Sequence, residues 1–91
     1  MRFVRTNTFK RDFKKLSYAM KRSADKALRF FTNNPRHSSL RVKKMQGQYD
    51  AVGRDIWEAR VNQKYRFTFA IDADTYILYR IGPHDIERHP R

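Results

Sequence analysis

The sequence predicts an α+β fold with an N-terminal strand, a helical hairpin and then an antiparallel three-stranded meander. Apolar residues recur every three or four positions up to about residue 31 and at alternate positions from about residue 57 onward. These are the periods of an amphipathic helix and of a half-buried strand. The links between the alternating runs are short enough for hairpins. Because each layer has one apolar side, we expect one sheet with both helices packed on the same face.

The first third of the chain is predicted to form a strand and two helices. Residues 2–5 form the short strand, and Asn7 and Thr8 can cap the helix after it. The second helix ends where Asn34 meets Pro35, because the residue before proline avoids helical geometry. Each helix carries an apolar stripe at helical spacing: Phe9, Phe13, Leu16 and Met20 in the first, and Ala24, Ala27, Leu28 and Phe31 in the second.

The rest of the chain divides into a connecting segment and a meander. Residues 35–53 contain two of the three glycines and one of the three prolines, so we expect an irregular segment that can hold a brief strand. Three alternating runs follow, at residues 57–61, 65–71 and 77–81. Their large apolar residues have odd numbers. We therefore expect the odd-numbered face to pack under the helices and the even-numbered face to be open. With 91 residues, the chain has room for a single domain, residues 1–91.

Composition points to a polyanionic partner. The 21 Lys and Arg residues against nine Asp and Glu leave a net charge of +12, which repels itself unless an anion offsets it. No run approaches the roughly 18 apolar residues of a membrane span, and no apolar signal region follows Met1, so we expect a cytoplasmic protein. The absence of cysteine excludes disulfides and thiolate metal sites, and three scattered histidines argue against catalytic zinc. We therefore expect nucleic acid, RNA first, as the partner, and no cofactor.

Arginine is concentrated on the expected open face, where neighbouring strands carry Arg60, Arg66 and Arg80. A guanidinium group matches a phosphate bidentately, so these residues can form an anion cradle. The alternative is a charged surface that maintains solubility, and the pattern by itself gives the two interpretations similar weight. The basic residues of the helices are interpreted as a solvated face that steers the domain toward a polyanion.

Two titratable residues accompany these arginines. His84 follows the last strand directly, and imidazole exchanges a proton near neutral pH. Glu58 precedes Arg60 and Arg66 on the same expected face, where it is either an ion-pair partner or a general base. The alternative for His84 is an ordinary surface histidine near the chain end.

Several segments, taken in order, resemble the RelE/ParE superfamily of toxin–antitoxin toxins, and the resemblance covers nearly the whole chain. It is carried by the basic segment 34–47, by Ile56-Trp57-Glu58-Ala59-Arg60-Val61, by Tyr65-Arg66-Phe67, and by Ile81-Gly82-Pro83-His84-Asp85. For the RelE branch the resemblance implies a microbial-ribonuclease-like fold that enters the ribosomal A site and cleaves messenger RNA. It also implies a cognate acidic antitoxin protein that wraps and silences a monomeric toxin.

On the matching positions, Arg66 resembles the phosphate-binding arginine of the family, Arg60 the arginine of the preceding strand, and His84 the acid/base histidine of some branches. RelE is known for lysines on its central strand, whereas this chain has Ile56 and Glu58 there. The pattern is therefore closer to the histidine-using relatives, with His37 or Glu58 as the general base. The residues expected to bind RNA are Arg41, Lys43, Lys44, Arg80 and His37.

The chain ends soon after His84, so we expect the C-terminal helix of some relatives to be absent. Two other functions are compatible with the resemblance and the charge. One is a ParE-like, non-catalytic inhibitor of DNA gyrase, which has no use for an acid/base histidine at position 84. The other is a basic domain that binds nucleic acid without cleaving it.

Overall fold

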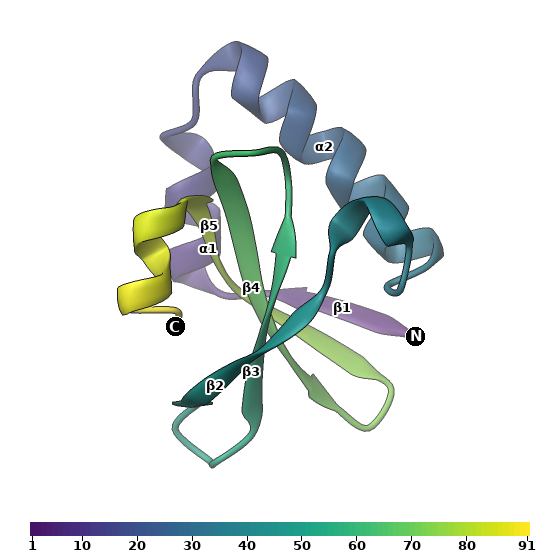
Figure 1. The fold of residues 1–91 in the computed structure, drawn as a ribbon, viewed down its shortest axis with the longest axis vertical. Coiled ribbons are helices and arrows are strands. Elements are labelled where there is room, and N and C mark those ends of the chain that lie inside the picture. The colour runs from purple at the N-terminus through teal and green to yellow at the C-terminus, as the bar shows by residue number, and fades with distance from the viewer.

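The computed structural model describes all 91 residues, and its helices cross one side of a twisted sheet (Figure 1). The elements are, in order, β1 (Arg2–Arg5), α1 (Asn7–Lys14), α2 (Tyr18–Asn33), η1 (Ser38–Leu40), β2 (Lys43–Tyr49), β3 (Asp55–Arg60), β4 (Tyr65–Asp72), β5 (Thr75–Pro83) and η2 (His84–Arg88). The strand order is β1-β5-β4-β3-β2, with β1 parallel to β5 and the other neighbours antiparallel. The predicted α+β class is confirmed. None of the helices is long and apolar enough to cross a membrane.

The two helices begin at side-chain caps. Thr6 caps α1, because its Oγ1 accepts a hydrogen bond of 3.0 Å from the Phe9 amide. Asn7 and Thr8 therefore lie inside the helix, and the cap is one residue earlier than the sequence predicts. Ser17 caps α2 by accepting from the Met20 amide at 3.1 Å. Each cap satisfies an amide that has no partner within its helix, typically worth about 1 kcal/mol.

Phenylalanine rings fill the core between α2 and the sheet. Phe31 of α2 is completely buried, and its ring centroid lies 5.1 Å from that of Phe67 and 4.8 Å from that of Phe69. Full burial of each such side chain stabilises the fold by about 1.5 to 3 kcal/mol. The odd-numbered residues of β3 and β4 thus face the helices, as predicted.

The last strand changes its facing side at a β-bulge. Thr68 pairs with Arg80, but Phe69 pairs with Leu78, so that Tyr79 is an extra residue. Leu78 therefore joins the core under the helices. The Tyr79 hydroxyl instead donates a 2.9 Å hydrogen bond to Asp50. The expectation that Ile77 and Tyr79 face the helices is wrong, because the bulge reverses the alternation within β5.

β2 is a complete strand at the sheet edge, and the meander therefore has a fourth antiparallel strand. Its sequence, Lys-Lys-Met-Gln-Gly-Gln-Tyr, is mostly polar because an edge strand needs no apolar face. Asp50 holds the hairpin that follows, accepting from Arg54 Nε at 2.7 Å and from Tyr79. Burial would raise the pKa of Asp50, but hydrogen bonds from Arg54 and Tyr79 lower it to about 2.

Candidate functional site

The strand register aligns polar residues in two rows on the sheet face opposite to α2. The first row runs from β2 to β5 and consists of Lys43, Glu58, Thr68 and Arg80. The second row consists of Arg60, Arg66 and Gly82. By strand register, the predicted face contains Lys43, Glu58, Arg60, Arg66 and Arg80. Arg60, at the end of β3, also lines a hollow with Lys26 and Phe30 of α2.

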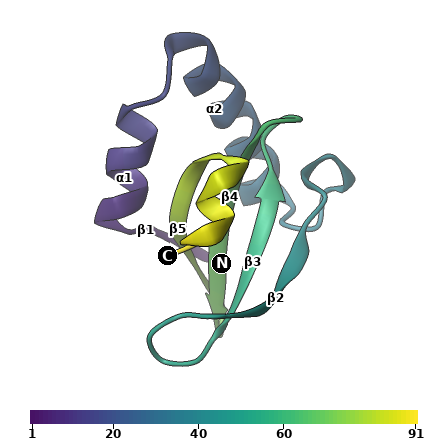
Figure 2. The same cartoon turned by 60° about the vertical axis from the view of Figure 1, so that its left-hand side comes forward.

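The C-terminal segment, residues 84–91, covers part of this face (Figure 2). A Cβ at Gly82 would lie 3.0 Å from the Ile86 side chain, so any other residue here would push that side chain aside. Thr68 Oγ1 donates to the Pro90 carbonyl at 2.6 Å. The expectation of a fully open face is therefore wrong. Within this segment, residues His84–Arg88 form a short 3₁₀ helix, η2.

Glu58 is buried under this segment. It is 3% exposed, and its Oε1 lies 3.4 Å from Nζ of Lys43. Its other oxygen, Oε2, accepts no hydrogen bond. Burial and the neighbouring carboxylate of Glu87 raise the pKa of Glu58 to about 7, while Lys43 opposes the shift. The carboxyl group can therefore exchange a proton near neutral pH.

The arginines of the second row have no acidic partner. No carboxylate lies within 4.0 Å of Arg60 or Arg66, which face each other across β3 and β4. Arg66 Nη1 donates to the carbonyls of Asn62 at 2.6 Å and Tyr65 at 3.0 Å. These two bonds fix the guanidinium against the hairpin and leave Nε and Nη2 as donors for an anion.

Arg80, by contrast, is engaged within the fold. Its Nε and Nη2 donate to Asp12 of α1 at 2.8 and 3.0 Å, and its Nη1 donates to the His89 carbonyl at 3.2 Å. The guanidinium therefore links α1, β5 and the C-terminal segment. In this arrangement it is not a free contact for RNA.

His84 directly follows β5, as the first residue of η2. Its amide donates to the Lys64 carbonyl at 3.0 Å, which attaches the start of η2 to the β3–β4 hairpin. Arg66 pairs with Gly82, two residues before His84. The imidazole is exposed and makes no hydrogen bond within the protein.

The other predicted RNA contacts lie elsewhere. His37 Nδ1 accepts from the Ser39 amide at 3.1 Å, and its ring stacks on Phe30 of α2 with the centroids 4.4 Å apart. Lys44 pairs with Trp57, which packs against the core under the helices, and Arg41 joins Trp57 in lining a cleft there. His37, Arg41 and Lys44 are therefore on the helix side, which separates His37 from Arg66.

Sequence reasoning missed the contribution of the C-terminal segment. Glu87 lies beside Glu58, and the carbonyls of His89 and Pro90 accept hydrogen bonds from Arg80 and Thr68. The sequence of the segment is mostly polar, which is typical of a solvated tail. The one available signal was Gly82 followed four residues later by an isolated Ile86. No group of three or more His, Asp or Glu side chains is arranged to hold a metal ion.

Solved structures share this architecture over nearly the whole chain. A RelB–RelE antitoxin–toxin complex from Methanococcus jannaschii matches with a TM-score of 0.71 and 17% identity, covering 94% of this chain and 95% of that one. The YoeB/ParE toxin from Agrobacterium tumefaciens matches with a TM-score of 0.71 and 15% identity, covering 92% and 99%. YafQ from E. coli matches with a TM-score of 0.68 and 16% identity, covering 93% and 96%.

No family model matches the sequence, and no curated protein is similar to it in sequence. At these identities the agreement concerns the backbone arrangement and not individual site residues. It confirms the fold that the resemblance implies, and the chain has the RelE-like toxin fold.

Proposed function

We propose that this protein is the toxin of a toxin–antitoxin pair and that it cleaves messenger RNA in the cytoplasm, on the ribosome and without a metal ion. The observation that supports this most strongly is the second row of the polar face. Arg60 and Arg66 lie opposite each other without an acidic partner, and His84 comes two residues after Gly82, the β5 partner of Arg66. Paired guanidinium groups without counter-ions favour a phosphate ligand.

The proposed reaction is transfer of a phosphoryl group to the neighbouring ribose oxygen. A base removes the proton of the 2′-hydroxyl, the 2′-oxygen forms a bond to phosphorus, and the bond to the 5′-oxygen breaks. Arg60 and Arg66 stabilise the charge of the pentacoordinate phosphorane. His84, in its protonated form, donates a proton to the leaving 5′-oxygen. The products are a 2′,3′-cyclic phosphate and a 5′-hydroxyl end.

Glu58 is the candidate base on this face. Its pKa of about 7 suits proton transfer at neutral pH, because such a group is partly ionised and still basic. The C-terminal segment separates Glu58 from solvent, so this role requires Glu87 and the residues after it to move aside. His37, the other candidate from the sequence, lies beyond reach on the helix side.

The test is to map RNA ends in cells after induction of the wild type, Arg66→Ala or His84→Ala. We expect growth arrest and new messenger RNA ends with the wild type, and loss of both in the two variants. Arg29→Ala, which removes an exposed arginine of α2, serves as the matched control and should behave like the wild type. Unchanged cleavage in both variants would refute the proposed chemistry.

Inhibition of DNA gyrase is the second candidate function, because the YoeB/ParE structure fits this chain as well as the RelE complex does. Expression would then induce DNA damage signalling while messenger RNA remains intact. Gyrase supercoiling would be blocked in vitro, and His84→Ala would block it equally. A basic domain that binds nucleic acid without cleaving it would show neither effect.

A cognate antitoxin is part of the proposal. Several of the matching structures are complexes with RelB or DinJ antitoxins. A chain with a net charge of +12 should attract an acidic partner that folds as it binds. We expect the acidic product of an adjacent gene to co-purify with this protein and to prevent growth arrest. Failure of every neighbouring product to do so would contradict the toxin–antitoxin assignment.

A further inference from the structure

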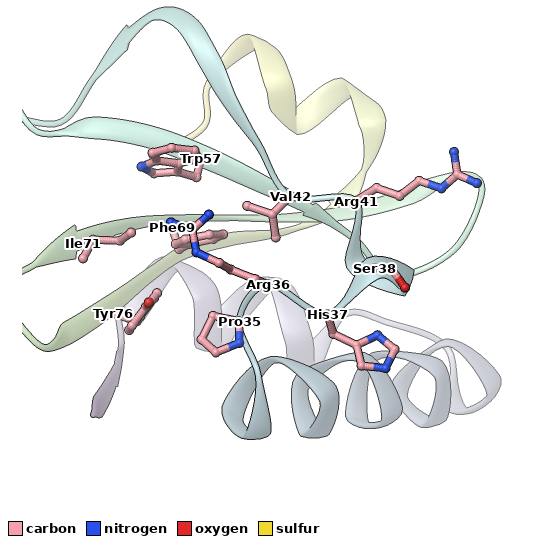
Figure 3. Close-up of a pocket in the computed structure, with 10 residues that line it drawn as sticks. All are labelled: Pro35, Arg36, His37, Ser38, Arg41, Val42, Trp57, Phe69, Ile71 and Tyr76. Atoms are coloured by element: carbon pink, nitrogen blue, oxygen red, sulfur yellow. The ribbon is translucent and has the colours of Figure 1, made fainter.

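A cleft of about 280 Å³ opens on the helix side of the sheet, just beyond the end of α2 (Figure 3). α2 ends at Asn33, and the chain then turns through Pro35 toward η1, so the helix does not cover the adjoining part of β3, β4 and β5. The cleft is lined by residues 35–38 and by Arg41, Val42, Trp57, Phe69, Ile71 and Tyr76.

The floor of the cleft is apolar. Trp57, Ile71 and Tyr76 surround Phe69, and Val42 closes one end (Figure 3). Phe69 is buried, Trp57 and Tyr76 are half-buried, and Ile71 is 37% exposed. This surface remains in contact with water although it continues directly from the core. Covering it with an apolar side chain would therefore be favourable.

The rim of the cleft is cationic. Residues 35–44 contain Arg36, Arg41 and Lys44 on this side and no Asp or Glu, whereas Lys43 pairs with Glu58 on the opposite face. Arg36 points from the chain after α2 toward Phe69, whereas Arg41 points outward (Figure 3). Neither Arg36, Arg41 nor Lys44 has a carboxylate within 4.0 Å. Arg41 also has a left-handed backbone, with a φ of 46°, which is costly for any residue with a side chain.

The cleft fits a protein segment better than a nucleobase. A base binds by stacking on an open aromatic face. Tyr76 is already stacked on Phe3, at 5.4 Å and 23°, and Phe69 is buried against Phe31. Val42 and Ile71 offer aliphatic surface instead. An aliphatic or aromatic side chain flanked by carboxylates would satisfy both the floor and the rim.

We propose that this cleft is a docking site for an acidic segment of a partner protein, which inserts one apolar side chain between Trp57, Ile71 and Tyr76. The identification of that partner as an antitoxin rests on the proposed function, whereas the docking itself does not. The cleft and the polar face lie on opposite sides of the sheet. The helices cover the side with Trp57 and its strand neighbours Lys44, Phe69 and Leu78, and the C-terminal segment covers the side with Glu58. A partner can therefore anchor here without covering Arg66.

The test is a selection from a random-peptide display library against the folded wild-type chain, followed by fluorescence titration of the selected peptides. Trp57 is the only tryptophan, so its emission reports directly on the cleft. We expect the selected peptides to be acidic with one recurrent apolar position and to shift the Trp57 emission. Arg36→Glu and Ile71→Asp should each weaken binding by about tenfold or more, because they remove the rim charge and the apolar contact.

Arg29→Glu is the matched control, because it makes the same charge reversal on the exposed side of α2. It should change the affinity by no more than about twofold if the attraction is local rather than a consequence of net charge. Circular dichroism establishes whether each variant is folded. If Ile71→Asp is unfolded, the rim is still tested by Arg36→Ala, which is a milder change. Equal weakening by Arg29→Glu and Arg36→Glu would overturn the proposal.

Two further outcomes would also overturn it. One is a selected set without acidic residues or without an apolar position. The other is a shift of the Trp57 emission by a single-stranded RNA oligonucleotide at the same concentration, which would make the cleft an RNA subsite. Measuring RNA cleavage by Arg36→Ala distinguishes the docking proposal from the proposed function. If this variant loses peptide binding but cleaves RNA normally, the substitution affects the cleft alone.

Discussion

The two faces of the sheet are covered in different ways. On one face, α2 packs phenylalanine against phenylalanine, and Phe31, Phe67 and Phe69 are buried almost completely. On the other face, the covering segment is residues 84–91, in which Ile86 and Pro90 are the buried residues. The same strands thus supply a core on one side and a polar row beneath a short segment on the other.

The helix face supplies most of the stability, and the polar face carries the proposed chemistry. Aromatic packing stabilises the helix face by several kcal/mol, because each buried ring contributes about 1.5 to 3 kcal/mol. The C-terminal segment is held by the contact of Ile86 with Gly82 and by three hydrogen bonds: one from its His84 amide to Lys64, and one each from Thr68 and Arg80 to its carbonyls. Segments with so few contacts open locally at a lower free energy than the core. The polar face can therefore be exposed while the fold stays intact.

The largest expected effect is on the rate of RNA cleavage and comes from His84→Ala. Loss of a proton donor should reduce the rate by roughly 10² to 10⁴. His37→Ala is the matched control, since it removes an imidazole on the opposite side of the sheet, and it should leave the rate nearly unchanged. Single-turnover cleavage of a labelled messenger RNA measures both rates. An equal loss of cleavage rate in the two variants would contradict the assignment of the chemistry to the polar face.

The next effect is on the pH dependence of stability. The folded-state pKa of Glu58 is about 7 against 4.5 for the ordinary carboxyl group, so the folded state binds more protons between these values. The free energy of unfolding should therefore fall by roughly 3 kcal/mol as the pH rises from about 4 to 8. Urea unfolding of Glu58→Gln should lack this fall.

Glu87→Gln provides the control for that result. Removing the neighbouring carboxylate should lower the pKa of Glu58 and reduce the fall without abolishing it, because burial remains. If the wild type and Glu58→Gln have parallel stability profiles across this pH range, Glu58 does not carry the proton that we assign to it.

A smaller effect should follow from Thr68→Val, which keeps the shape of the side chain and removes the hydrogen bond to Pro90. The loss leaves a buried carbonyl without its donor and should cost about 1 to 2 kcal/mol. Amide exchange of residues 86–89 should accelerate more than that of β4. Thr32→Val is the control, because its hydroxyl bonds to Arg29 on the exposed surface of α2. Uniform acceleration over the whole chain would show that the segment does not open independently.

The smallest effect concerns the cleft rim on the helix face. Arg41→Gly should stabilise the fold by up to about 1 kcal/mol, because glycine tolerates a φ of 46°. Arg41→Ala keeps a Cβ and should give no such gain. Thermal unfolding measures both. A loss of stability in Arg41→Gly would show that the arginine side chain makes contacts that outweigh the backbone cost.

The helices and central strands could be predicted because the spacing of their apolar residues is compatible with only one buried face. Phe9 and Phe13 mark a helical face, and Phe67 and Phe69 mark the buried side of a strand. β5 was ambiguous, since Ile77 and Leu78 are both apolar and either can face the core. The bulge at Tyr79 turns Leu78 toward the core instead of Ile77. The Tyr79 hydroxyl bonds to Asp50, which is too distant in sequence for a local pattern to reveal the contact.

The site was predicted in part for similar reasons. Strand alternation places Glu58, Arg60 and Arg66 on one face whatever covers it. The partner of Arg80 could not be foreseen, because Asp12 lies 68 positions away on α1. His37 could not be placed either, because its position depends on where α2 ends and how the following chain turns.

The most direct test of the division between the two faces compares Arg66→Ala with Arg36→Ala in one cleavage assay. Arg66→Ala should reduce the rate by roughly 10² to 10³, the usual consequence of removing a donor that stabilises a transition-state oxyanion. Arg36→Ala, which removes the same group from the helix face, should cleave at the wild-type rate. Equal rates for the two variants, whether both normal or both impaired, would contradict the account.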